Sequence, residues 1–203
     1  MKICDVKTVF LTGPFTEDPF LVECRSRRSA AFIEIHTDTE IIGLGETYAG
    51  YFCPEAVPPL VDFFRPILVG LQGDELQVDE LWRRMYHCGN FWCRVGLGLS
   101  VLNGIEAALW DLKGKILRKP VYELLGGRRN ERLFAYASGG PSNYPMTKLA
   151  AKMDYYQSLG FKGVKFGAGQ YWSDKGFVVS LEPAEAADTE AGKLEFLRAR
   201  TGP

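Results

Sequence analysis

The chain has 203 residues, of which 46% are hydrophobic and 24% charged, and its formal net charge is −1. These values are typical of a folded globular protein and allow one large domain or two small ones. A nearly neutral balance, without a basic or acidic block, excludes the electrostatic footprint of a nucleic-acid or anionic-membrane partner. No apolar run is long enough to cross a bilayer.

Five cysteines accompany an N-terminus in which Asp5 comes too early for a signal peptide. We therefore expect reduced thiols and a cytoplasmic protein. Cys88 and Cys93 lie close to His87 in the sequence HCGNFWC, whose residue types could bind a metal. The spacing differs from the usual Cys-x2-Cys, and no second pair lies at a suitable distance, so buried or idle thiols are favoured over a zinc site.

The first half of the chain predicts strands and then helices. Strand patterns occur at residues 2–11, 30–36 and 41–48. They indicate a three-stranded antiparallel meander, with a loop over residues 12–28 between the first two strands. A loop rich in Gly and aromatic residues covers residues 49–53, and helical patterns follow at residues 54–69 and 78–86. This order is typical of an α+β unit.

The most informative segment is residues 101–127, VLNGIEAALWDLKGKILRKPVYELLGG. Apolar residues recur there and just before it at steps of three and four, which places them on one side of a long helix: Val95, Leu99, Leu102, Ile105, Leu109, Leu112 and Ile116. Pro120 cannot continue that helix. A short helix over residues 121–125 follows and stops at Gly126 and Gly127.

The pattern changes after Gly127. Strand patterns at residues 132–138 and 162–166 enclose a helix over residues 146–159, which Gly160 ends in a position suited to a left-handed cap. A further helix is predicted over residues 182–200. Alternating strands and helices indicate parallel βα units, as in a barrel or a doubly wound sheet.

The same segment also carries a family resemblance. The run from Gly104 to Lys115 (GIEAALWDLKGK), followed by PVY and LLGG, resembles the helix that links the two domains of the enolase superfamily, in its mandelate racemase and muconate lactonizing branch. Gly43-Leu44-Gly45-Glu46 resembles a common element of the third strand of that family's first domain.

The resemblance implies an α+β capping domain over residues 1–127, and over residues 128–203 the first βα units of a (β/α) TIM-like barrel, which is incomplete here. Two capping-domain loops select the substrate in that family, and here they correspond to residues 13–28 and 49–53. Their aromatic residues are candidate substrate contacts: Phe15, Phe20, Tyr51 and Phe52. The alternative for each is a loop aromatic packed against its neighbours.

The implied chemistry is removal of a proton α to a carboxylate, with the resulting charge held on Mg²⁺. The second barrel strand of the family often shows Lys-x-Lys. Lys165 matches the first lysine and becomes the candidate catalytic and substrate-binding residue, whereas Gly167 occupies the second position. Lys162 cannot replace the second lysine, because an offset of three puts it on the opposite face. A lysine base is therefore absent, which favours an acid-sugar dehydratase with a histidine base elsewhere over a racemase with two bases.

The family's metal ligands lie on later barrel strands and match no residue of this chain, and His36 and His87 are poor candidates for the base. We expect the chain to have no metal ligands of its own, no tight Mg²⁺ site and no turnover alone. Its expected partner is a small carboxylate such as a sugar acid, and a full-length form is expected to be a homo-oligomer. The alternatives are a non-catalytic truncated isoform or fragment that associates with a full-length subunit, and an unrelated α/β binding domain.

Overall fold

The computed structural model describes residues 1–14, 16–22, 27–73, 76–141, 146–167, 170–173 and 176–179. The chain divides into two compact units. Unit 1 comprises Met1–Pro14 and Arg27–Arg129, and unit 2 comprises Phe15–Ser26 and Asn130–Pro203.

A three-stranded sheet forms one layer of unit 1. Strands β1 (Ile3–Pro14), β2 (Arg27–Thr37) and β3 (Ile42–Thr47) pair antiparallel in that order, which confirms the predicted meander. The prediction of a loop over residues 12–28 is wrong at both ends. Thr12 pairs with Ser29 and Pro14 with Arg27, and the hydroxyls of Thr12 and Ser29 lie 2.9 Å apart. The ladder continues there because each strand gives the other a backbone partner.

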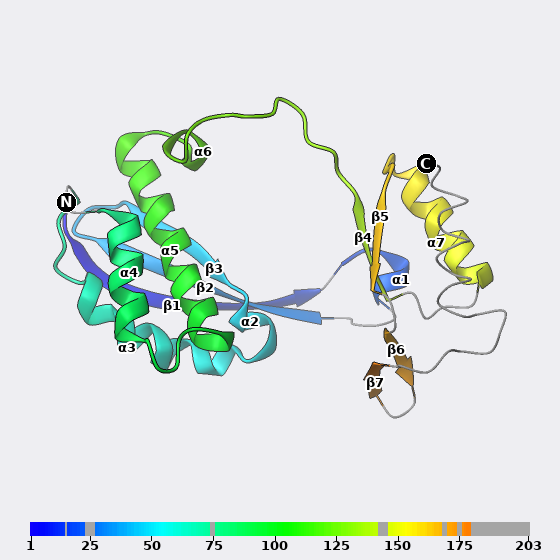
Figure 1. Ribbon diagram of the computed structural model, residues 1–203, viewed down its shortest axis with the longest axis horizontal. Helices are drawn as coiled ribbons and strands as arrows, with labels where there is room; N and C mark the ends of the chain where they lie inside the picture. The colour runs from blue at the N-terminus through cyan, green and yellow to red at the C-terminus, as the bar shows by residue number, and fades with distance from the viewer. Residues whose placement is uncertain are drawn as a thin grey trace. The chain divides into compact units, whose positions relative to one another are not determined.

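Helices cover one face of this sheet (Figure 1). Burial alternates along β2 and β3, so that Ile33 and Ile35 are buried together with Gly43 and Gly45. Helices α3 (Val57–Leu68) and α5 (Gly96–Leu117) pack on the sheet, and α4 (Val78–Cys88) packs on both helices. The largest buried side chains of this core are Ile3, Ile33, Ile35, Phe64, Leu68, Leu76, Leu81, Met85, Leu102, Ile105 and Leu109.

Small residues let β3 approach the backbone of α5 very closely. A Cβ atom on Gly45 would overlap the carbonyl oxygen of Gly104, and a Cβ atom on Gly43 would overlap that of Ala108. A Cβ atom on Gly104 would in turn lie 2.9 Å from the Cβ atom of Thr47. The glycines of the two motifs are therefore needed for packing, because the strand and the helix leave no room for a side chain.

The free edge of β3 is covered by polar residues of α5. The amide of Leu44 donates to Asp111 Oδ2 at 2.7 Å, and Lys115 Nζ donates to the carbonyl oxygen of Ile42 at 2.7 Å. Asp111 and Lys115 also form an ion pair at 2.7 Å. An edge strand otherwise exposes such groups to pairing with another chain, so these residues of the motif have a structural role.

The long helix differs in detail from its prediction. It begins at Gly96, and Val95 lies outside it in an extended conformation with 78% of its surface exposed. Val101 and Ala108 are buried in addition to residues of the predicted apolar side. The reason is that α5 contacts the sheet on one side, whereas helices α3 and α4 pack against its other sides. The short helix α6 (Val121–Leu124) follows, and Gly126 and Gly127 have positive φ angles that suit glycine.

The segment predicted as a loop over residues 49–53 is also different. Residues Ala49–Phe52 form the short helix α2, and the 3₁₀ turn η1 (Pro54–Ala56) leads into α3. The amide of Cys53 donates to the carbonyl oxygen of Ala49 at 2.9 Å, which closes this helical turn. The glycine and aromatic residues there suggested a loop, but α2 packs against β2 and α5, and this packing stabilises a turn whose own helix propensity is low.

Unit 2 begins a parallel sheet. Strands β4 (Ala137–Pro141) and β5 (Val164–Gly167) pair parallel, and helix α7 (Met146–Ser158) connects them. This confirms the predicted βα order, and the positive φ of Gly160 confirms the predicted cap. The unit also contains α1 (Pro19–Val22) and the antiparallel pair of β6 (Gln170–Ser173) and β7 (Gly176–Val179).

The predicted strand over residues 132–138 begins later than expected, at Ala137. Its partner strand starts at Val164, which is paired with Ala137, so the residues before Ala137 have no ladder to join. Phe134 instead places its ring beside Gly163, where a Cβ atom would lie 3.0 Å from the ring. The helix predicted over residues 182–200 lies outside the described residues.

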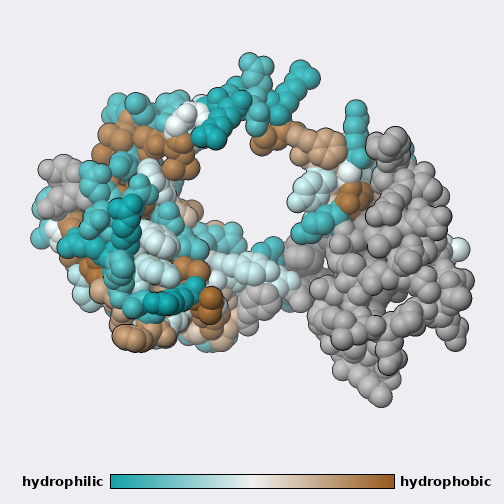
Figure 2. All heavy atoms as spheres, viewed as in Figure 1, coloured by the Kyte–Doolittle hydropathy of each residue, from teal (hydrophilic) through white to brown (hydrophobic). Residues whose placement is uncertain are grey.

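The described surface is mixed in polarity. On the face of unit 1 shown in Figure 2, hydrophobic patches lie between larger hydrophilic areas. Within the described ranges, no helix is long and apolar enough for a bilayer crossing. Helix α5 has 22 residues, but Glu106, Asp111, Lys113 and Lys115 give it too much charge for one.

Candidate functional site

Lys165 lies on the side of the parallel pair opposite α7 in unit 2. It is exposed on β5 and is paired in register with Ser138 of β4, which is also exposed. Its neighbour Val164 points the other way and lines a hollow together with Met153 and Gln157 of α7. Because successive side chains of a strand alternate, α7 covers one side of the pair and Lys165 projects from the other.

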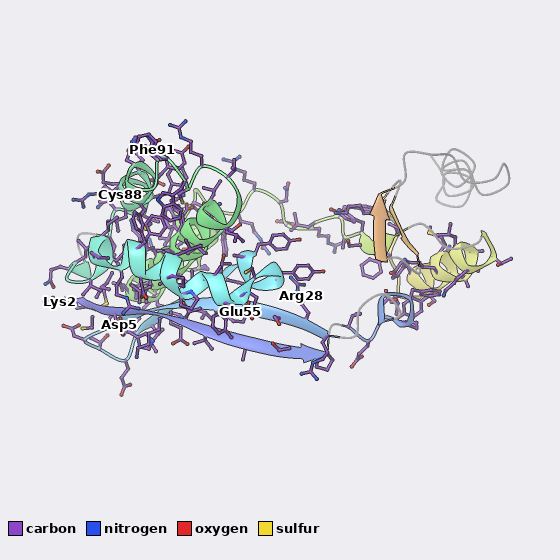
Figure 3. All side chains as sticks on the ribbon, turned by 90° about the horizontal axis from the view of Figure 1, so that it is seen from below. Lys2, Asp5, Arg28, Glu55, Cys88 and Phe91 are labelled. Carbon is purple, nitrogen blue, oxygen red and sulfur yellow. The ribbon has the colours of Figure 1, made fainter. Side chains whose placement is uncertain are left out.

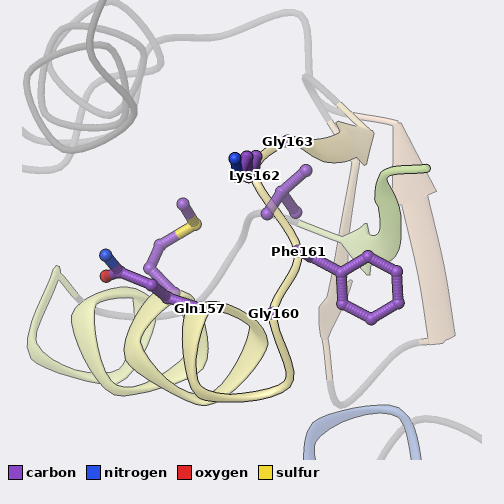
Figure 4. Close-up of a pocket in the computed structure, with 7 residues that line it drawn as sticks. Gln157, Gly160, Phe161, Lys162 and Gly163 are labelled. Atoms are coloured by element: carbon purple, nitrogen blue, oxygen red, sulfur yellow. The ribbon is translucent and has the colours of Figure 1, made fainter. Parts of the chain in front are cut away.

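Lys162 lies on the side of α7, as its offset from Lys165 predicts. It lines the same hollow as Gln157, Gly160 and Phe161, and the volume of this hollow is about 670 Å³ (Figure 4). Lys162 therefore cannot act beside Lys165. Gly167 pairs with Pro141 and, as a glycine, adds no side chain beside Lys165.

Tyr51 lies in an aromatic stack in unit 1. Its ring is parallel to that of Tyr48, with centroids 5.6 Å apart and planes 7° from parallel. The guanidinium carbon of Arg28 lies 4.8 Å from the Tyr51 centroid, within cation–π range. Tyr48 is 62% exposed, so this cluster offers a flat aromatic surface beside a cation.

The other predicted aromatic residues have different outcomes. Phe20 belongs to unit 2 and packs against Tyr155 of α7, with ring centroids 5.9 Å apart. Phe15 lies outside the described residues, and Phe52 has a described backbone in α2 without a described side chain. The role of all four as substrate contacts stays a prediction.

Arg28 and Tyr48 contact Tyr51, but the sequence analysis did not predict either as a site residue. It also missed Lys152, which lies near the Phe20 ring, and the hydrogen-bonded pair Asp18 and Tyr156. Tyr48 and Tyr51 are spaced by three, which is one helical turn, and this spacing could have indicated the stack. The contact between Asp18 and Tyr156 joins residues 138 positions apart in the sequence, so no local sequence pattern could predict it.

The two cysteines of the sequence HCGNFWC lie in different environments. Cys93 is buried in the core of unit 1, and this burial raises the pKa of its thiol. Cys88 is exposed near the end of α4, and it lies with Phe91 on the helical side of the unit, away from β1 (Figure 3). Among the described residues, no three His, Cys, Asp or Glu side chains are grouped so that they could hold a metal ion.

The two histidines both belong to unit 1. His36 pairs with Glu34 at 2.8 Å on β2, and His87 is exposed on α4 beside the ring of Tyr86. That they are poor candidates for the base stays a prediction.

Comparison with solved structures defines the class of protein. The chain aligns over its full length with 49% of the 3,6-anhydro-D-galactonate cycloisomerase of Zobellia galactanivorans, at a TM-score of 0.74 and 26% identity. It also aligns with 50% of an enolase superfamily member from Polaromonas, at a TM-score of 0.71 and 27% identity. The fold is that of the N-terminal half of enolase-superfamily enzymes: a capping domain followed by the start of a parallel sheet.

The family follows from the sequence itself. Residues 6–126 match the N-terminal domain of mandelate racemase and muconate lactonizing enzymes. The chain belongs to the mandelate racemase / muconate lactonizing enzyme family of the enolase superfamily.

Curated relatives of the chain are named as acid-sugar dehydratases. The arabinonate dehydratase of Saccharolobus solfataricus is 36% identical over 67% of this chain and 36% of its own length. A D-galactonate dehydratase family member of Cellvibrio japonicus is 30% identical over 92% of this chain and 43% of its own length. The chain thus spans less than half the length of these relatives.

Proposed function

We propose that this chain supplies the cap and the first barrel strands of an acid-sugar dehydratase. The names of its relatives support the reaction class, and the observation that carries the proposal is the position of Lys165. Its ammonium group is exposed on the side of the β4–β5 pair that α7 leaves uncovered. That side corresponds to the inside of a completed barrel, and such enzymes bind substrate at the mouth of the barrel, where the strands have their carboxyl ends.

In this proposal Lys165 binds the carboxylate of a sugar acid. A fixed positive charge stabilises the additional negative charge that develops on the carboxylate as the proton on C2 leaves. The hydroxyl on C3 takes up a proton and leaves as water, which balances the proton lost from C2, and the enol product tautomerises to a 2-keto-3-deoxy acid. Gly167 has no side chain, so the base that takes the proton is not a lysine at this position.

The residues that the structure describes do not form a binding site for the Mg²⁺ of the family. These residues contain no cluster of three metal-binding side chains, so no step of the proposed mechanism is assigned to the ion. The chain's contribution is to bind the carboxylate and to select the sugar. We assign selection to the aromatic residues of the two loops: Phe15, Phe20, Tyr51 and Phe52.

A second candidate function is non-catalytic association with a full-length subunit. It is favoured by β5, which has a strand neighbour only on its β4 side in the part of the chain that the structure describes. An unpaired strand edge is a template for another strand.

The test expresses the coding sequence that contains these 203 residues up to its own stop codon. The product is assayed with arabinonate, galactonate and mannonate in the presence of Mg²⁺, and the 2-keto-3-deoxy acid is measured. Lys165→Met is compared with Lys162→Met, which removes an exposed lysine from the side of α7. We expect Lys165→Met to lower kcat/KM on the order of 100-fold, the typical cost of a lost charge-stabilising group, and Lys162→Met to have little effect.

Equal effects of the two variants, or no product from any sugar acid with the complete translation product, would overturn this proposal. The 203-residue chain alone is expected to give no product. If it is itself the complete product, co-purification with a full-length relative from the same cells supports the second function. Dehydration by the 203-residue chain alone would show that its own residues hold the metal.

A further inference from the structure

The α1 segment, residues 16–22, lies between β1 and β2 in the sequence but packs on α7 in unit 2 (Figure 1). The hydroxyl of Tyr156 donates to Asp18 Oδ2 at 2.5 Å. Tyr156 is only 3% exposed, so this hydrogen bond is largely shielded from water. A short bond from a phenol to a carboxylate belongs to the stronger class of hydrogen bonds.

Asp18 also organises the segment internally. Its other carboxylate oxygen, Oδ1, accepts a hydrogen bond from the amide of Phe20 at 2.8 Å. The amide of Asp18 donates to Thr16 Oγ1 at 3.1 Å. One carboxylate thus shapes the turn that begins α1 and fixes it to α7, which means that the conformation and the position of the segment are coupled.

Phe20 provides the apolar part of the same contact. Its ring packs against that of Tyr155 at an angle of 53°. Lys152 Nζ lies 6.0 Å from the centroid of the Phe20 ring and donates to the carbonyl oxygen of Gly139 in β4. Lys152 is fully buried, so its ammonium needs these partners to offset the loss of water.

We propose that Lys152, Tyr155 and Tyr156 form a docking site on α7 that holds the α1 segment. Lys152 and Tyr156 are spaced by four and Tyr155 follows Lys152 by three, so all three occupy one region of the helix surface. Tyr156 and Lys152 are positioning residues in this arrangement, because they act through Asp18 and Phe20. By holding the α1 segment, the docking site also positions Phe20, which the proposed function assigns to selection of the sugar. That consequence rests on the proposed function, whereas the docking itself does not.

The experiment measures hydrogen exchange at the amides of Asp18 and Phe20 in the purified 203-residue chain. Tyr156→Phe removes the hydroxyl that binds Asp18 and keeps the ring. Tyr155→Phe is the matched control, since it removes the hydroxyl of the adjacent residue and keeps the ring that packs on Phe20. We expect Tyr156→Phe to accelerate exchange at these two amides about tenfold, and Tyr155→Phe to leave it near the wild-type rate.

A second variant separates docking from general damage to α7. Asp18→Ala changes the segment alone, and Tyr156→Phe should add nothing further to its effect on the segment if the two residues act as a pair. Equal exchange in the two tyrosine variants, or additive effects of Asp18→Ala and Tyr156→Phe, would overturn the docking site. If docking is confirmed but the enzyme assay gives no product, only the proposed function fails. In an active enzyme, Tyr156→Phe should raise KM more than it lowers kcat.

Discussion

Units 1 and 2 bury their side chains in different ways. The main hydrophobic cluster takes its buried members from unit 1, where a sheet, α3, α4 and α5 enclose them. The described core of unit 2 consists of a two-stranded sheet and α7, and a lysine is among its fully buried residues. Apolar burial is the main favourable contribution to folding, so unit 1 should be the more stable of the two.

The largest expected effect distinguishes these two cores. Leu109 in α5 and Leu149 in α7 are both fully buried. We expect Leu109→Ala to lower the free energy of unfolding of unit 1 by about 2–5 kcal/mol, through lost burial and a cavity. Leu149→Ala should affect only the amides of unit 2. Hydrogen exchange of α5 and α7 measures both, and a shared set of accelerated amides in the two variants would show a single cooperative core instead.

The second prediction tests how tightly unit 1 is packed. Gly45→Val places a side chain against the backbone of α5 at Gly104, where neither partner can move freely. We expect a loss of about 2–3 kcal/mol in the free energy of unfolding, measured by urea titration and circular dichroism. Gly13→Val is the control, because a Cβ atom there meets nothing within 4 Å. A loss of the same size at both positions would mean that strand propensity, and not the close contact, is responsible.

The sequence predicted much of unit 1 and less of unit 2, for physical reasons. Alternation in residues 30–36 and the three-four spacing around Leu109 are local signals, and both elements formed, although α5 begins at Gly96 and leaves Val95 outside. Strand β4 starts at Ala137 because its partner residue Val164, 27 positions later in the sequence, is where β5 begins. The residues around Ala137 therefore could not show by themselves where the strand starts.

The same division applies to the candidate site. Lys165 could be placed on one side of its strand from alternation alone, and its exposure opposite α7 agrees with that. The contacts of Phe20 depend on a helix more than a hundred positions away in the sequence, so its packing on Tyr155 could not be predicted. Long-range contacts of loops are thus the part of a site that local patterns leave open.

The smallest expected effect concerns the covered edge of β3. Asp111→Ala removes the acceptor of the Leu44 amide and the partner of Lys115. We expect a loss of about 1–2 kcal/mol in the free energy of unfolding of unit 1, because a hydrogen bond to a charged group is lost but water can reach part of the site. Asp111→Asn keeps an acceptor oxygen and should lose less. Because the edge is then open to pairing, Asp111→Ala should also increase self-association, which sedimentation at rising protein concentration measures. If the two substitutions cost the same, the charge of Asp111 and its ion pair with Lys115 would account for the stabilisation, and the hydrogen bond to β3 would not.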